Sequence, residues 1–124
     1  MNETAVGEAI KESGIPREEI FITTKVWVQD YSYEKTIKAV ELSLERLGVE
    51  YIDLMLLHQP IGDYINAWKA LEKLYKEGKL RAIGMANCYP HVIADLCMTF
   101  EIKSNRLTKW NYIRFFNNSL TLIQ

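Results

Sequence analysis

Two ionisable side chains lie near the ends of apolar segments and carry the functional groups of acid–base chemistry. Lys25 lies in the apolar, β-branched stretch 20–26, and His58 directly follows the nearly continuous apolar run Tyr51–Leu57. A lysine cation stabilises a neighbouring anion, and an imidazole donates or accepts a hydrogen bond near neutral pH. Either residue alone is more often a solvated charge or a structural group, so the prediction of a site depends on their being brought together.

The elements that would position these side chains alternate along the chain. Helical spacing of apolar residues, terminating glycines and Pro90 predict helices over 3–13, 34–47, 63–77 and 90–99. Short apolar stretches predict strands over 20–26, 51–57 and 80–85. Strands that alternate with helices of about 10–15 residues indicate βαβ units, and therefore an α/β fold with a parallel sheet.

The parallel arrangement predicts where the polar side chains meet. Right-handed crossovers place the carboxyl ends of all the strands at one edge of the sheet. Lys25, His58 and Asn87 are therefore expected to converge there, although they are far apart in sequence. Asp53 lies inside a predicted strand, where we expect a structural role, as hydrogen-bond partner of neighbouring backbone or of a cation.

Composition narrows the class of protein. The 124 residues are 48% hydrophobic and 25% charged with a net charge of -1, which suits one modest domain and gives no attraction to nucleic acid or an anionic membrane. No apolar run approaches the roughly 18 residues of a membrane span, and the start MNETAVGEAI is not a secretory signal, so we expect a cytoplasmic chain. Cys88 and Cys97 match no zinc pattern, which predicts reduced thiols and no metal.

Three segments carry a family resemblance: ETAVGEAIKESGIPREEIFITTKVW, LERLGVEYIDLMLLHQP and YKEGKLRAIGMAN. On these segments residues 3–103 resemble the middle of an aldo-keto reductase. The resemblance implies a (β/α)₈ TIM barrel, of which this chain would hold about three parallel strands and about four helices. It also implies an oxidoreductase that uses NADPH to reduce an aldehyde or ketone to an alcohol. Nothing in the chain selects among small-molecule carbonyl substrates.

The resemblance assigns roles to four positions. Lys25 and His58 match two members of the family's catalytic tetrad of Asp, Tyr, Lys and His. In the family this histidine also hydrogen-bonds the substrate carbonyl, which makes His58 an expected substrate contact. Trp27 matches an aromatic that lines the substrate pocket, and Asn87 matches the asparagine that binds the nicotinamide carboxamide. The family usually has a serine and an aromatic residue at the positions of Ala86 and Cys88. Because alanine cannot make the hydrogen bond of that serine, we expect weaker binding of the cofactor at this point.

The tetrad aspartate and tyrosine have no counterpart in this chain. In the family they belong to a segment like DTAxxYxNE, and Met1 falls just after the position of the tyrosine. The tyrosine is the family's proton donor, and the lysine lowers its pKa. We therefore expect this truncated chain to be inactive, with NADPH binding weakened by the missing segments.

The segment 104–124 departs from the family pattern and is expected to form a separate tail after the partial barrel of residues 1–103. Read one nucleotide earlier, the codons of Trp110–Asn118 permit Val/Met-Glu-Leu-His-Pro-Phe-Phe-Gln-Gln, which resembles the family continuation VELHPFFQQ. A frameshift near residues 103–106 explains this coincidence. We expect the tail to be poorly ordered or to pack opportunistically against the rest of the chain, because its sequence is not adapted to this fold.

Three functional interpretations follow. The first is a segment of an NADPH-dependent carbonyl reductase. The second is a non-catalytic remnant, the product of a pseudogene, and the third is a half-barrel that acts as an interaction module. An open three-stranded sheet would leave two unpaired edges and an uncovered face, so we expect marginal stability and self-association.

Overall fold

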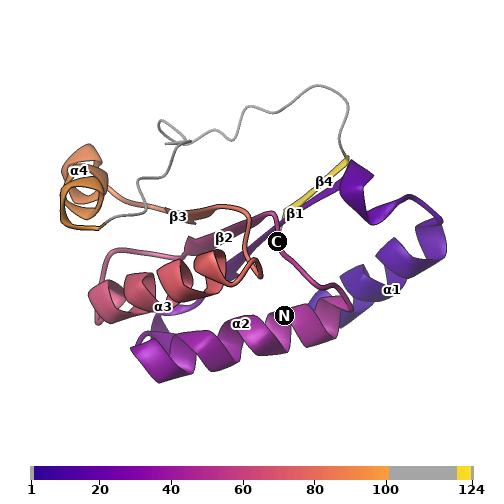
Figure 1. Ribbon diagram of the computed structural model, residues 1–124, viewed down its shortest axis with the longest axis horizontal. Coiled ribbons are helices and arrows are strands. Elements are labelled where there is room, and N and C mark those ends of the chain that lie inside the picture. The colour runs from indigo at the N-terminus through magenta and orange to yellow at the C-terminus, as the bar shows by residue number, and fades with distance from the viewer. Residues whose placement is uncertain (1, 101–119, 124) are drawn as a thin grey trace.

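The structure, a computed structural model, describes residues 2–100 and 120–123 as a parallel sheet flanked by helices (Figure 1). The strands are β1 (Ile20–Val26), β2 (Leu54–Leu57), β3 (Ile83–Met85) and β4 (Leu120–Ile123), in the order β3-β2-β1-β4. The helices are α1 (Glu3–Ser13), α2 (Tyr33–Leu47), α3 (Tyr64–Lys76) and α4 (Pro90–Thr99), with short 3₁₀ turns η1 (Arg17–Glu19) and η2 (Val28–Asp30). The three predicted strands and four predicted helices are confirmed.

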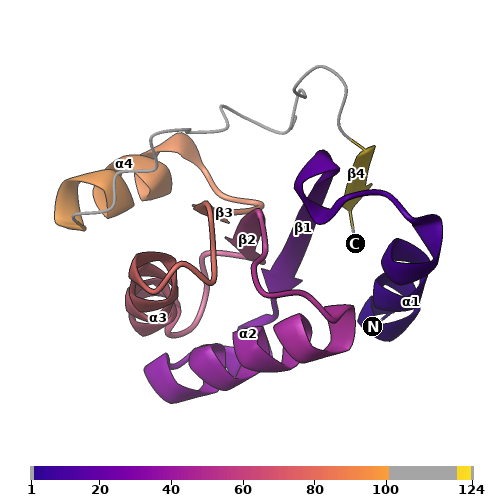
Figure 2. The ribbon, with the colours of Figure 1, turned by 45° about the vertical axis from the view of Figure 1, so that its right-hand side comes forward.

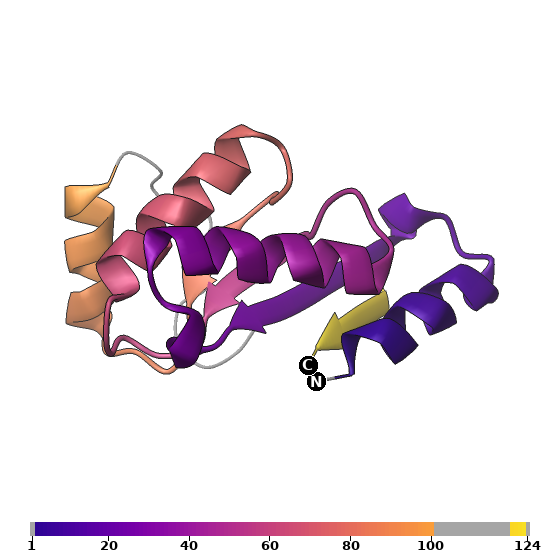
Figure 3. The same cartoon turned by 90° about the horizontal axis from the view of Figure 1, so that it is seen from below.

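The two faces of the sheet differ in what covers them. Helices α1, α2 and α3 follow one another around one face, and α4 continues the series (Figures 2 and 3). Side chains alternate along a strand, so Ile20, Ile22 and Val26 of β1 pack with Met55 and Leu57 of β2 in the core beneath the helices. The alternate positions, Lys25 among them, therefore belong to the opposite face.

That opposite face is less open than the sequence predicts. Thr23, Leu54 and Leu56 are buried, although among the described residues they do not belong to the core cluster beneath the helices. One reason lies at Gly84 in β3, where an added Cβ would stand 2.7 Å from Leu56 Cδ2. The absence of a side chain at Gly84 thus leaves room for Leu56 over the neighbouring strand β3.

The strand β2 is shorter than predicted because of Asp53. Its carboxylate Oδ2 accepts the Ile22 N–H at 2.9 Å, so this amide of β1 is bound by a side chain at the point where the β1–β2 ladder begins. The strand consequently starts at Leu54, and Ile52 forms only an isolated bridge with Leu80. Asp53 thus lies just before the strand and not inside it.

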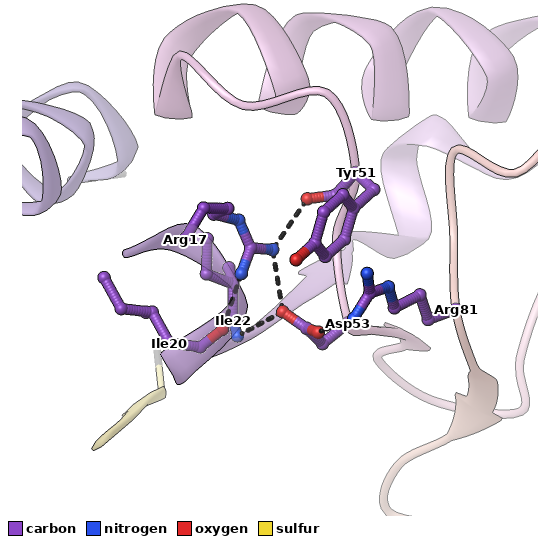
Figure 4. A network of polar contacts seen from close by, with 6 residues as sticks. All are labelled: Arg17, Ile20, Ile22, Tyr51, Asp53 and Arg81. Atoms are coloured by element: carbon purple, nitrogen blue, oxygen red, sulfur yellow. Dashed lines mark hydrogen bonds and ion pairs between the residues drawn. The ribbon is translucent and has the colours of Figure 1, made fainter. Parts of the chain in front are cut away.

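Asp53 is the centre of a polar network at the amino ends of the strands (Figure 4). Arg17 donates to Asp53 Oδ2 at 2.7 Å and to the carbonyl oxygens of Tyr51 and Ile20. Arg81 approaches Asp53 Oδ1 at 3.7 Å. The guanidinium carbons of both arginines lie over the Tyr51 ring, 4.0 and 3.7 Å from its centroid. The predicted structural role of Asp53, toward backbone and a cation, is confirmed.

The last strand comes from the tail. β4 runs parallel to β1 in the register Ile20↔Leu120 to Thr23↔Ile123, and lies beside it in Figure 1. One edge that the sequence predicts to be unpaired is therefore covered over four residues, because any extended segment satisfies the backbone groups of an edge strand. The rest of the predicted tail, 104–119 and 124, lies outside the described residues.

Candidate functional site

The strand ends bring the predicted site residues to one edge of the sheet. Lys25 pairs in register with Leu56, and Leu57 pairs with Met85, so β1, β2 and β3 end side by side. His58 follows β2 directly, and Asn87 lies two residues beyond β3. The predicted convergence is therefore present in the backbone.

His58 and Trp27 form an aromatic pair at this edge. Their rings are stacked, with centroids 4.3 Å apart and planes inclined by 22°. The His58 amide donates to the Val26 carbonyl at 3.1 Å, which extends the β1–β2 pairing to the residue that carries the imidazole. Trp27 is 42% exposed and His58 is half-buried, so this pair is an aromatic surface that an incoming small molecule can contact.

Asn87 joins the same cluster through the backbone of His58. Its Nδ2 donates to the His58 carbonyl at 3.0 Å, and the Ala86 amide donates to the Leu57 carbonyl at 2.8 Å. Asn87 adopts a φ of 50°, a left-handed conformation that asparagine tolerates better than most residues. The bond therefore ties the loop after β3 to the loop after β2.

Lys25 lies beside this cluster and does not contact its polar members. Within residues 2–100 and 120–123, no hydrogen bond or ion pair joins Lys25 to His58 or Asn87. A hollow of about 330 Å³ runs from the end of β1 to α2. Its lining residues include Lys25, Trp27, Asp30, Lys38 and Arg46. His58 and Asn87 do not line it. The half-buried Lys25 thus belongs to the open edge of β1 beyond Thr23, where β4 does not reach.

Tyr31 is a residue of this edge that sequence reasoning missed. It is only 7% exposed, and its hydroxyl donates to the Gln59 carbonyl at 2.9 Å while accepting the Gln59 N–H at 3.1 Å. Burial raises the pKa of the Tyr31 phenol above its ordinary value of 10.0, against the opposing effect of the hydrogen bonds. The available signal was an aromatic residue in the short stretch 27–33, between a predicted strand and the next predicted helix.

The described residues carry neither a metal cluster nor a membrane span. No group of three or more His, Cys, Asp or Glu side chains in this portion of the chain is arranged to hold a metal ion. No helix among those described is both long and apolar enough to cross a bilayer. The functional groups that this edge of the sheet offers are an imidazole, an indole, a carboxamide, an ammonium and the buried phenol of Tyr31.

Comparison with known proteins identifies the family. Residues 1–115 match the model of the Aldo/keto reductase family. The chain belongs to this family. A glyoxal reductase of Bacillus subtilis (strain 168) is 55% identical over 103 residues, and a 9,11-endoperoxide prostaglandin H2 reductase of Trypanosoma cruzi (strain CL Brener) is 53% identical over 103 residues. Each alignment covers 82% of this chain, which spans 37% and 36% of the lengths of these two reductases.

Solved aldo-keto reductases share the fold. An aldo-keto reductase from a Medee basin deep-sea metagenome library is 48% identical with a TM-score of 0.80. The aldo-keto reductase of Bombyx mori in complex with NADP is 33% identical with a TM-score of 0.77. Each comparison covers 82% of this chain and 38% of the solved aldo-keto reductase. The predicted partial (β/α)₈ barrel is confirmed, whereas the division at residue 103 stays a prediction, since the family match includes residues 104–115.

Proposed function

We propose that the barrel to which this segment corresponds reduces an aldehyde or ketone to an alcohol with NADPH as the hydride donor. The observation that carries the proposal is the stacked Trp27–His58 pair at the end of β2, with Lys25 at the end of the adjacent strand. A relative named glyoxal reductase and a solved aldo-keto reductase in complex with NADP support this choice of reaction and cofactor.

The proposed roles follow from the charge that the reaction creates. Addition of hydride to a carbonyl carbon leaves negative charge on the oxygen, which must be protonated. His58 offers an imidazole to hydrogen-bond that oxygen, and Trp27 offers the apolar wall against which the substrate lies. Lys25 supplies a cation that lowers the pKa of a neighbouring phenol, the group that donates the proton in the family.

Asn87 fits one contact of the nicotinamide. Its amide has two N–H donors and one carbonyl acceptor, and a single donor is used by the His58 carbonyl. The remaining donor and the acceptor suit the carboxamide of the nicotinamide, which supplies hydride when bound. Ala86 has no hydroxyl to share that contact, so we expect the fit to be partial.

A chimera tests the proposed activity. Residues 3–103 replace the aligned segment of the Bacillus subtilis glyoxal reductase, which then supplies the remaining strands, and NADPH consumption with glyoxal is followed by absorbance. We expect turnover by the chimera and none by the 124-residue chain, because this chain has no counterpart of the tetrad tyrosine and aspartate. A folded chimera without turnover would contradict the proposed activity, whereas turnover by the 124 residues alone would contradict only their expected inactivity.

We also infer that the chain associates with copies of itself in the cytoplasm. In the described portion of the sheet β3 pairs only with β2, and the edge of β1 is unpaired beyond Thr23. Exposed strand edges are templates for pairing with another chain. Sedimentation of the purified chain should show dimers or larger species that grow with concentration. A monodisperse monomer with a cooperative thermal transition would rule this out.

A further inference from the structure

The segment after β1 and the segment after β2 are joined by one phenol. Tyr31 follows η2, and both of its hydroxyl bonds go to the backbone of Gln59, the residue after His58. A hydroxyl that donates to the carbonyl and accepts from the amide of the same residue fixes that residue at both of its peptide groups. The two segments lie 28 positions apart in sequence, so this bridge is a tertiary contact.

The segment that carries Tyr31 is itself held firmly. The Thr36 hydroxyl at the start of α2 donates to the Asp30 carbonyl at 2.9 Å, and the Asp30 amide donates to the Trp27 carbonyl at 2.9 Å. Thr36 is fully buried, and the Tyr31 side chain belongs to the hydrophobic core. The Tyr31 side chain is therefore held in place by its surroundings, independently of its hydrogen bonds to Gln59.

His58 is bracketed by two anchors of different kinds. On its amino side, its own amide is bound by the Val26 carbonyl of β1. On its carboxyl side, the next residue, Gln59, is bound by Tyr31. The imidazole stacks on Trp27, whose carbonyl begins the turn that leads to Tyr31. The bridge from Tyr31 to Gln59 thus connects the segment that carries the indole of Trp27 to the segment that carries the imidazole of His58.

We propose that Tyr31 is a positioning residue of the carbonyl site, which acts through Gln59 to hold the His58 imidazole against Trp27. The proposal rests on the proposed function, because an oriented imidazole serves to hydrogen-bond a substrate oxygen. The contacts among Tyr31, Gln59, His58 and Trp27 do not depend on cofactor or substrate. Because burial raises the pKa of the phenol, the hydroxyl remains protonated and able to donate throughout the neutral range.

The substitution Tyr31→Phe separates the hydroxyl from the ring. Phenylalanine keeps the apolar packing of the buried ring but loses both hydrogen bonds to Gln59. The matched control is Tyr75→Phe, which removes the hydroxyl of an exposed tyrosine near the end of α3. Both variants are made in the full 124-residue chain, with Trp27→Leu as the reference that lacks the stacking partner.

The measurement is the ring-current displacement of the His58 C–H resonances by NMR. The stacked indole shifts these protons, and Trp27→Leu defines the value without it. We expect Tyr31→Phe to remove at least half of the displacement, and Tyr75→Phe to leave it unchanged. Resonances of His58 that stay in place in a folded Tyr31→Phe variant would overturn the proposal, whatever happens to the thermal stability.

A second measurement needs no substitution and covers a variant that fails to fold. Amide hydrogen exchange at Gln59 in the unaltered chain should be slower than at the exposed neighbour Ile61, because Tyr31 occupies the Gln59 amide. Exchange as fast as that of Ile61 would also overturn the proposal. Neither readout uses NADPH or a carbonyl, so their failure is distinct from an inactive chimera.

Discussion

The substitution Asp53→Ala is expected to lower the free energy of unfolding by about 3–5 kcal/mol, the cost of removing one partner from a buried ion pair. The Asp53 side chain is 7% exposed and that of Arg17 is 20% exposed, so water cannot replace the lost carboxylate fully. The Ile22 N–H loses its acceptor in the same step, since Asp53 Oδ2 receives both donors. An unmade bond to a buried amide adds to the loss.

Urea denaturation of the chimera measures this effect, because the remaining strands of the barrel support a weakened segment. Asp53→Asn keeps one oxygen acceptor and should fall between the unaltered chain and Asp53→Ala. Glu50→Ala is the matched control, since it removes an exposed carboxylate three positions away and should change the free energy by less than about 0.5 kcal/mol. A loss below about 1 kcal/mol for Asp53→Ala would show that the network of Figure 4 is not a main support of the sheet.

The substitution Lys25→Met in the chimera is expected to lower kcat/KM by about 10²–10⁴-fold, the usual contribution of an activated proton donor. Methionine keeps an unbranched side chain of similar length but removes the cation, so the neighbouring phenol would no longer have its pKa lowered. Affinity for NADPH, measured by fluorescence, should change little because Lys25 is not assigned a cofactor contact.

Lys38→Met is the matched control for this loss. Lys38 lines the same hollow as Lys25 but lies on α2 and is exposed. The Lys38→Met variant should retain nearly full turnover. This result would show that the cation is needed at the end of β1, and not merely anywhere in the hollow. If Lys25→Met and Lys38→Met lower kcat/KM equally, the assignment of Lys25 to proton transfer is wrong.

The placement of the candidate residues at one edge of the sheet followed from the sequence because it depends on backbone geometry. Alternating elements and right-handed crossovers suffice to bring Lys25, His58 and Asn87 to one edge of the sheet. The side-chain contacts do not follow in this way. The Trp27–His58 stack and the bond from Asn87 to the His58 carbonyl depend on rotamers and on a left-handed backbone that no local pattern specifies.

Contacts between distant loops and side chains account for the other differences. The bridge from Tyr31 to Gln59 joins two segments whose patterns, read separately, indicate only loops. The start of β2 was misplaced because the Asp53 carboxylate binds an amide of β1, which hydrophobicity does not reveal. β4 was not predicted because its pairing with β1 uses backbone groups, which carry no sequence signature.

β4 occupies an edge of β1 with which another strand could pair. The strands β2 and β3 are added in turn on one side of β1, so a strand that preceded α1 in the same βα series would belong on the other side of β1. β4 already binds Ile20–Thr23 there. Any other strand that pairs with this part of β1 must therefore displace the segment Leu120–Ile123, so the two pairings exclude each other.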